Sequence, residues 1–326
     1  MRNWSVHLAL MTLGQAGSLA AQGQLETARV PSQALGVAKA IVVYLPASYE
    51  TSSRRYPVAY YLHGVAGTER AWTKRVALDS IADSLSRAGV GEAIVVMPDG
   101  DSAFWTDWEQ PDAYWQGCLT DSARIRPDEP ATTDCVPHAR YETYLVHDIV
   151  PFVDSAYRTL RNRKHRGLGG LSMGGYGAIA VALRHSDLFS AAVSHSGVVS
   201  PLSIGPRPCR SKHCFASTVS EILEHRPSSP QRLLVLAFGA DTSGWWKRDP
   251  SRLMDRLLAN GQALPALYLD VGLEDPFLNQ NRAFADRLKK RHVRYTYHEW
   301  PGGHDRFYWR AHAGEGLSWL LARIGR

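Results

Sequence analysis

The sequence predicts a single α/β domain in which a mostly parallel sheet is covered by helices on both faces. Short apolar and β-branched runs alternate with stretches of helical periodicity, and this alternation is typical of parallel sheets. A chain of 326 residues, 44% of them hydrophobic, can bury one large core. A Gly-x-Ser-x-Gly stretch at residues 170–174 joins a strand to a helix. No internal repeat and no linker indicates a second domain.

The first half of the chain predicts three strands and two helices. The helices are expected at residues 75–88, which are amphipathic, and at residues 141–157, which place apolar side chains at core spacing. Pro151 lies inside the second helix and predicts a kink or a boundary between two shorter helices. The strands are expected at residues 39–45, 57–62 and 93–97.

The second half predicts the same alternation. Residues 167–170 (Gly-Leu-Gly-Gly) should form the strand before Ser172, although so many glycines weaken the strand pattern. Residues 201–217 are rich in Pro, Cys and Ser and predict an irregular segment. Further strands are expected at residues 191–194, 233–238, 266–271 and 293–298, and helices at residues 175–184, 249–260, 279–291 and within 306–323.

An N-terminal secretory signal is expected at residues 1–22. Arg2 supplies a positive start, residues 6–13 supply a short apolar stretch, and residues 18–21 are small enough for cleavage. An amphipathic or disordered start is the alternative, because polar residues interrupt the apolar stretch. Cleavage would leave one domain at residues 23–326, with an aromatic insertion around residues 101–140, in a secreted or periplasmic protein.

The four cysteines suit an exported protein. Cys118 and Cys135 bracket one polar loop, and Cys209 and Cys214 bracket another, so two local disulfides are expected. Four free thiols in a cytosolic protein are the alternative. Neither pair has zinc-ligand spacing, and we expect no metal and no organic cofactor.

A net charge of +6 raises the question of a nucleic-acid partner. The densest basic run, residues 161–166, lies between a predicted helix and a predicted strand, and no RNA- or DNA-binding motif accompanies it. We therefore expect a solvated loop there and no nucleic-acid partner. No stretch is long enough to be an integral membrane segment, and the sequence indicates no particular oligomeric state.

The Gly-x-Ser-x-Gly pattern is typical of a nucleophile elbow, in which the serine hydroxyl stands on a sharp turn between a strand and a helix. A serine needs a base, and the base needs an orienting acid. On a parallel sheet of this kind they follow in the order Ser, acid, His, each after a strand. Ser172, Asp275 and His304 fit this order, and Glu274 and Asp241 are alternatives for the acid.

The tetrahedral intermediate of acyl transfer needs backbone donors for its oxyanion. One donor is expected from Met173, the residue after the nucleophile. The other is expected from the turn after the strand at residues 57–62, where Val65 is the preferred donor and Gly64 the second choice. His63 in the same turn is expected to be structural. The other histidines that do not follow a strand after the acid are expected to be structural or surface groups: His138, His147, His195 and His298.

Over roughly residues 35–322 the chain resembles the putative-esterase family of α/β hydrolases. The resemblance depends on motifs that begin at Leu62 (Leu-His-Gly), Phe104 (Phe-Trp-Thr-Asp), Tyr141 (Tyr-Glu-Thr-Tyr-Leu), Gly170 (Gly-Leu-Ser-Met-Gly-Gly-Tyr-Gly-Ala), Ser194 (Ser-His-Ser-Gly) and Gly302 (Gly-Gly-His-Asp). The family includes esterase D (S-formylglutathione hydrolase), feruloyl and acetyl esterases, and the antigen 85 mycolyltransferases. The resemblance implies an α/β-hydrolase fold and a serine carboxylic ester hydrolase with Ser172, Asp275 and His304 as its triad.

The ester itself is less well indicated. Trp105, Trp108 and Trp115 in the insertion could line a pocket for the substrate, or they could pack beneath the insertion as a small core. A small-molecule, carbohydrate or lipid ester is expected. Acyl transfer to a sugar or lipid alcohol would use the same triad, and a non-catalytic carbohydrate- or surface-binding module is the alternative from another class.

Overall fold

The computed structural model describes residues 22–112, 135–202, 216–225 and 229–325. Residues 1–21 of the expected signal segment, Trp115, Cys118, Cys209 and Cys214 lie outside the described residues. Cys135 is described and is completely buried. The two disulfides therefore remain predictions.

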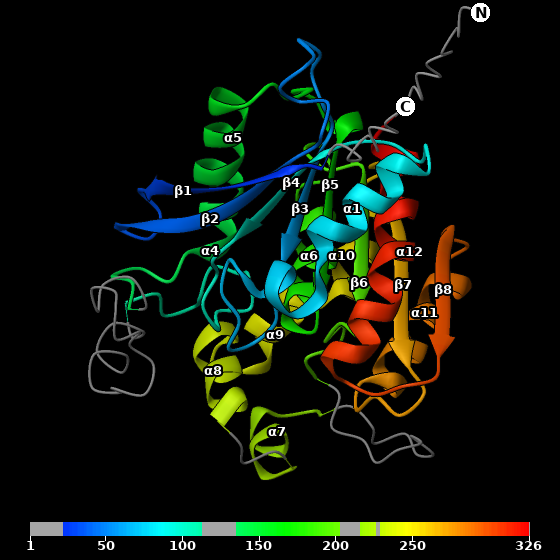
Figure 1. Cartoon of the computed structure of the whole chain (residues 1–326). Helices are drawn as coiled ribbons and strands as arrows, with labels where there is room; N and C mark the ends of the chain where they lie inside the picture. The colour runs from blue at the N-terminus through cyan, green and yellow to red at the C-terminus, as the bar shows by residue number, and fades with distance from the viewer. Residues whose placement is uncertain (1–21, 113–134, 203–215, 226–228, 326) are drawn as a thin grey trace, which may run out of the picture.

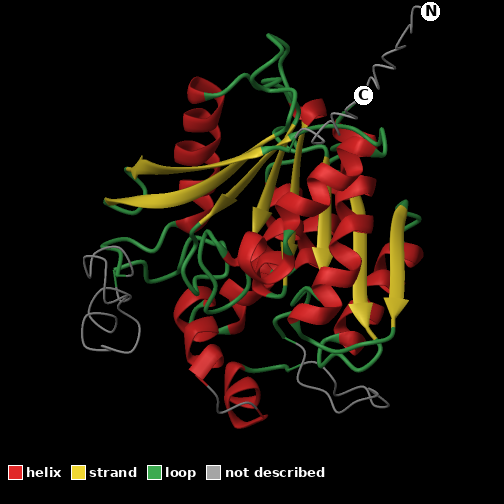
Figure 2. Ribbon diagram, viewed as in Figure 1, coloured by secondary structure: helices red, strands yellow, loops and turns green. Residues whose placement is uncertain are grey.

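An eight-stranded sheet runs through the molecule in the order β1-β2-β4-β3-β5-β6-β7-β8 (Figures 1 and 2). The pairs β1·β2 and β2·β4 are antiparallel, and all other neighbours are parallel. The strands are β1 (Gln24–Ser32), β2 (Val37–Leu45), β3 (Val58–Leu62), β4 (Ile94–Pro98), β5 (Arg166–Leu171), β6 (Ala191–His195), β7 (Ala266–Gly272) and β8 (Tyr295–Trp300).

Helices cover both faces of this sheet, as the sequence predicts (Figure 2). One apolar cluster holds Tyr60 and Leu62 of β3 together with α5, α6, α10 and α11, and the other holds Ala59 and Tyr61 of the same strand together with α1 and α12. Alternate side chains of β3 thus enter opposite cores. The main helices are α1 (Leu78–Arg87), α5 (Val150–Ala156), α6 (Met173–Arg184), α7 (Val219–His225), α8 (Ser229–Phe238), α9 (Thr242–Arg248), α10 (Pro250–Ala259), α11 (Leu278–Lys290) and α12 (Arg306–Ile324).

Two predicted helices are present but divided. The first is a π-helical turn η1 (Trp72–Val76) followed by α1, with Ala77 between them at φ 62°. The second consists of α4 (Tyr141–Thr143), a π-helical segment η3 (Tyr144–Ile149) and α5. Pro151 stands in the first turn of α5, directly after the π-helical segment, so the predicted boundary is confirmed.

The strand predicted at residues 233–238 is wrong, because these residues belong to the helix α8. Leu234, Ala237 and Phe238 are buried while Leu236 is exposed, which is the spacing of one helix face. A short apolar run does not distinguish a buried strand from a buried helix by its periodicity. The helix α9, which the sequence did not predict, follows directly.

Candidate active site

The turn around Ser172 joins β5 to α6 and holds the serine at φ 54°, ψ −118°. A Cβ atom on Gly170 would lie 2.1 Å from the carbonyl oxygen of Gly174, and one on Gly174 would lie 2.0 Å from the carbonyl oxygen of Leu62. No side chain fits at either position. The two glycines are therefore required by the close approach of β5, α6 and the end of β3, and the backbone strain is concentrated at the serine.

Ser172, His304 and Asp275 form one chain of hydrogen bonds. The Oγ of Ser172 lies 2.9 Å from Nε2 of His304, and Nδ1 of His304 lies 2.9 Å from Oδ2 of Asp275. Asp275 follows β7 and His304 follows β8, so the carboxyl ends of three parallel strands supply the three side chains. The structure brings together all three residues that the sequence analysis selected.

Two aromatic rings hold the imidazole of His304. Phe277 and Trp309 each meet it edge to face, with ring centroids 4.8 Å and 5.0 Å away. The second carboxylate oxygen of Asp275 accepts the backbone N–H of Phe277 at 2.7 Å, so the acid and this aromatic contact are fixed together. Packing thus leaves the histidine one orientation, toward both Ser172 and Asp275.

The two alternative acids occupy other positions. The side chain of Asp241 is exposed and caps α9 by accepting the N–H of Ser243 at 2.7 Å. Glu274 is also exposed, whereas Asp275 is 2% exposed. Among the described residues, Asp275 is the carboxylate that contacts His304.

The turn after β3 lies directly against the serine. A Cβ atom on Gly64 would lie 3.2 Å from Cβ of Ser172. The N–H of Gly67 donates to the carbonyl of Gly64 at 3.0 Å, and Ala66 has φ 57°, so residues 64–67 form a tight turn. On the other side of Ser172, Met173 begins α6, and the N–H groups of a first helical turn have no partner within their helix. The predicted donors Met173, Val65 and Gly64 thus belong to the two segments that flank the serine.

A family model described as "Putative esterase" matches residues 32–320. The chain belongs to this esterase family. An esterase of Mycobacterium tuberculosis is 27% identical over 290 residues, which cover 85% of this chain but 54% of that protein. The chain therefore spans about half the length of that relative. An acetyl esterase of Caldicellulosiruptor saccharolyticus is 22% identical over 271 residues, covering 83% of this chain and 85% of that protein.

Among solved structures, a ferulic acid esterase is similar to the chain at a TM-score of 0.67 and 25% identity, covering 93% of this chain and 99% of that one. The sheet, the elbow and the strand order agree with the α/β-hydrolase fold of such esterases. The fold expected from the family resemblance is confirmed.

Trp105 and Trp108 do not line a pocket, which corrects one of the two expectations for the insertion. Trp105 is completely buried, with its indole ring against Gly100 and Gly177, and its Nε1–H donates to the carbonyl of His63 at 3.1 Å. Trp108 is 3% exposed and donates to the carbonyl of Ala103 at 3.0 Å. Both serve as core residues with a satisfied N–H. Trp115, the third candidate, lies outside the described residues.

A cavity of about 280 Å³ opens beside the segment that follows β6. Trp246 is 39% exposed at its wall, while the neighbouring Trp245 is completely buried. Ser200 and Phe284 line the same cavity. In the part of the chain that the structure describes, no group of three His, Cys, Asp or Glu side chains could hold a metal, and no helix there is long and apolar enough to cross a membrane.

Sequence reasoning missed two features that support the site. Asn281 donates to the carbonyls of Gly197 and Phe277, both at 2.9 Å, and so ties the acid loop to the segment after β6. Lys39 is buried behind the turn of residues 64–67, beside Asp99 and Asp101. Lys39 could have been noticed in the sequence, because it is a lysine in an apolar strand run. No local pattern indicated the role of Asn281.

Proposed function

We propose that this protein is a serine carboxylic ester hydrolase that forms an acyl-enzyme on Ser172, with His304 as base and Asp275 as orienting acid. The observation that carries the proposal is the unbroken hydrogen-bond chain from the Oγ of Ser172 through His304 to Asp275, with the serine on a strained elbow. Membership of the esterase family supports it.

In this mechanism Nε2 of His304 takes the proton of Ser172 while Oγ attacks the ester carbonyl carbon. The amides of Met173 and of Val65, or of Gly64 in its place, would stabilise the oxyanion by a few kcal/mol. The C–O bond then breaks, and His304 gives its proton to the departing alcohol. Water, deprotonated by His304, attacks the acyl-enzyme, and the carboxylic acid leaves as Ser172 regains its proton.

Replacing Ser172 with alanine tests the assignment. Ser196→Ala is a matched control, since Ser196 is also buried, also has a positive φ (51°) and lies near the same strand ends. We expect Ser172→Ala to abolish turnover of an activated ester and Ser196→Ala to keep it within about threefold. Turnover by Ser172→Ala at the wild-type rate would contradict the whole proposal.

The substrate class is proposed from the relatives. Because the similar proteins include an acetyl esterase and a ferulic acid esterase, we propose small acyl or phenolic esters of carbohydrates as substrates, with lipid esters as the alternative. A panel of acetylated sugars, feruloyl esters, short-chain and long-chain acyl esters, and S-acyl glutathione would identify the preferred ester by kcat/KM.

Acyl transfer to a sugar or lipid alcohol would use the same three residues and would differ in excluding water from the acyl-enzyme. The ratio of alcoholysis to hydrolysis, measured with one activated ester and increasing acceptor alcohol, separates the two reactions. We expect hydrolysis to dominate at low acceptor concentration. Predominant transfer there would assign the protein as an acyltransferase instead.

Export is also proposed, with cleavage after a signal at residues 1–22 and disulfides Cys118–Cys135 and Cys209–Cys214. N-terminal sequencing of the mature protein and mass spectrometry of unreduced peptides test both statements. A mature chain that begins at Met1 and carries four alkylatable thiols would contradict them.

A further inference from the structure

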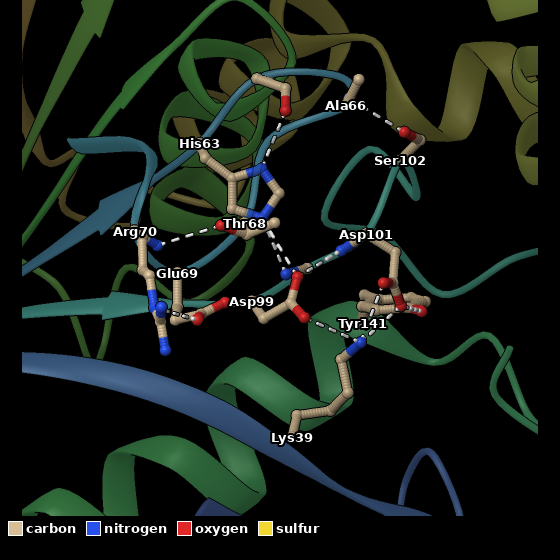
Figure 3. A network of polar contacts seen from close by, with 12 residues as sticks. Lys39, His63, Ala66, Thr68, Glu69, Arg70, Asp99, Asp101, Ser102 and Tyr141 are labelled. Atoms are coloured by element: carbon tan, nitrogen blue, oxygen red, sulfur yellow. Dashed lines mark hydrogen bonds and ion pairs between the residues drawn. The ribbon is translucent and has the colours of Figure 1, made fainter. Parts of the chain in front are cut away.

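A charged cluster lies buried behind the turn that flanks Ser172 (Figure 3). The ammonium of Lys39 in β2 is 3.1 Å from Oδ2 of Asp99 and 2.8 Å from Oδ1 of Asp101, and the Lys39 side chain is completely buried. The hydroxyl of Tyr141 contacts the Asp101 carboxylate as well. Burying three charges is costly, because each loses its hydration. The cluster therefore calls for an explanation beyond packing.

The surroundings of Lys39 favour its charged form. Burial alone would lower the pKa of Lys39, but the charges of Asp101 and Asp99 outweigh it and raise that pKa above its ordinary value. Burial raises the pKa of Asp101 to about 6 against the opposing charge of Lys39. At neutral pH the lysine is thus charged and holds both carboxylates at the end of β4.

The segment after β4 then fixes the ring of His63. The backbone N–H of Gly100 lies 2.9 Å from Nε2 of His63. A backbone N–H can only donate, so Nε2 is the acceptor and the ring proton is on Nδ1. Nδ1–H in turn donates to the carbonyl of Gly64 at 2.8 Å. The two ring nitrogens of His63 therefore bridge residue 100 and the turn beside Ser172.

That bridge has a direct consequence for Val65. The carbonyl of Gly64 and the N–H of Val65 belong to one planar trans peptide and point in opposite directions. The donors from His63 and from Gly67 hold this carbonyl in one direction, opposite to that of the Val65 N–H. Whatever holds the carbonyl also aims the N–H of Val65.

Two more contacts connect the same segments. The N–H of Ala66 donates to Oγ of Ser102 at 3.1 Å, and the indole of Trp105 donates to the carbonyl of His63 at 3.1 Å. His63 and Ala66, which flank the peptide between Gly64 and Val65, are thus both hydrogen-bonded to the segment after β4, which Lys39 holds through Asp99 and Asp101.

We propose that the Lys39–Asp99–Asp101 cluster, acting through His63, is a positioning device that aims the Val65 amide at the oxyanion formed on Ser172. This inference rests on the proposed function and goes beyond it by assigning roles to residues remote from the reacting atoms. Lys39 and His63 are positioning residues, because neither touches the serine.

Two substitutions of His63 separate its two hydrogen bonds. In His63→Asn the side-chain amide can still donate to the Gly64 carbonyl, whereas in His63→Gln the longer amide can still accept from Gly100 but no longer donates at the Nδ1 position. We expect His63→Gln to lower kcat by about 30-fold to 100-fold and His63→Asn by less than about tenfold, with KM changing less than threefold in both. The affinity for a boronic acid transition-state analogue should fall in parallel with kcat/KM.

Glu142→Gln is the control for a partly buried ion pair that is broken away from the turn, because Glu142 contacts Arg184 and His185. It should lower the melting temperature and leave kcat and boronate affinity unchanged. If the His63 variants behave like this control, or if His63→Gln is as active as His63→Asn, the inference is wrong. If Ser172→Ala loses activity while the His63 variants give one of these contrary results, the proposed function stands and only the inference about His63 fails.

Lys39→Gln tests the ionic part, because it keeps a hydrogen-bond donor but removes the charge. We expect kcat to fall about tenfold at unchanged KM. Asp101→Asn keeps the side-chain size and is the second variant, with an expected fall of about threefold; it decides the question if Lys39→Gln does not fold. Wild-type kcat and boronate affinity in whichever of the two variants folds would show that the Lys39–Asp99–Asp101 cluster does not help to position the Val65 amide.

Discussion

Two histidine–aspartate pairs lie close together in the sheet region, one on the strands β6 and β7 and one on the loops after β7 and β8, and of the two only the loop pair contacts a serine hydroxyl among the described residues. Nδ1 of His304 is 2.9 Å from Asp275, and Nδ1 of His195 is 2.7 Å from Asp270. The chemistry of the two pairs is the same. The His304 side chain is 22% exposed, however, and the His195 side chain is completely buried.

The second ring nitrogen distinguishes the pairs. Nε2 of His304 contacts Oγ of Ser172, whereas Nε2 of His195 is enclosed and has no hydrogen-bond partner among the described residues. The His195 ring contacts the rings of Trp72 and Tyr268. No substrate can reach a ring in that position, so this pair serves the structure.

The buried pair nevertheless supports the site. The carbonyl of His195 accepts the N–H of Ser172 at 3.0 Å, and Asp270 accepts the hydroxyl of Tyr308, four residues after His304, at 3.0 Å. Burial and the charge of Asp270 raise the pKa of Tyr308 well above its ordinary value, so the phenol stays a donor. In the proposed mechanism, the direction of Nε2 decides which pair is catalytic: Nε2 of His304 faces Ser172, whereas the His195 pair helps to hold the elbow in place.

The largest expected effect comes from the exposed pair. His304→Ala should lower kcat/KM by about 10⁴-fold or more, because Ser172 then has no base, while the free energy of unfolding changes by about 1 kcal/mol. Steady-state kinetics and urea unfolding measure the two quantities. The double variant with Ser172→Ala should lose no further activity, since the residues act as one unit. More than a tenth of wild-type activity in His304→Ala would show that another group is the base.

Asp275→Asn sharpens the choice of the acid. The amide keeps the size of the side chain but leaves His304 in the wrong tautomer, so kcat should fall by about 10³-fold to 10⁴-fold. Glu274→Gln and Asp241→Asn are the matched controls, and both should stay within twofold, because both side chains are exposed and neither contacts His304 in the described structure. A larger loss in either control than in Asp275→Asn would reassign the acid.

Asp270→Asn should affect stability instead. His195 loses a buried charged acceptor, so the free energy of unfolding should fall by about 3 kcal/mol, while kcat of the folded enzyme falls less than tenfold. Tyr308→Phe removes one hydrogen bond to the same carboxylate and should cost about 1 kcal/mol. If the Asp270→Asn variant kept wild-type stability but lost as much activity as Asp275→Asn, the assignment of Asp270 to structural support would be wrong.

The parts of the fold that the sequence predicted are those in which burial follows a local pattern. The parallel strands β3 to β7 are buried apolar runs, and the sequence located each of them. The edge strand β1 was missed because most of its side chains face solvent. Residues 233–238 were assigned to the wrong element because five or six apolar residues fit a helix as well as a strand.

Some residues of the site could likewise be predicted from the sequence, and others could not. Ser172, Asp275 and His304 each follow a strand, so their order along the chain was enough to predict that they meet. The direction of a side chain in a loop has no such rule, and Trp105 turned inward where a pocket was one expectation. The contact of Lys39 with Asp99 and Asp101 depends on the antiparallel pairing of β2 with β4, which the order of the elements does not disclose.

A third histidine–carboxylate pair gives the smallest expected effect and a test by pH. Glu142 lies 2.9 Å from Nε2 of His185 and also contacts Arg184. Burial alone would raise the pKa of Glu142, but these two partners outweigh it and lower the pKa below its ordinary value of 4.5. The pair therefore stabilises the fold at pH values above 4.5, and this contribution is lost as the pH falls through the lower, folded-state pKa.

Glu142→Gln should accordingly lower the free energy of unfolding by about 2 kcal/mol at neutral pH, and the difference from the wild type should shrink toward acid. Urea unfolding at a series of pH values from about 7 to 3 measures this difference. Activity should not change, because the pair lies on α4 and the end of α6, away from Ser172. A stability difference that stays constant down to about pH 3 would mean that Glu142 contributes through its shape and not through its charge.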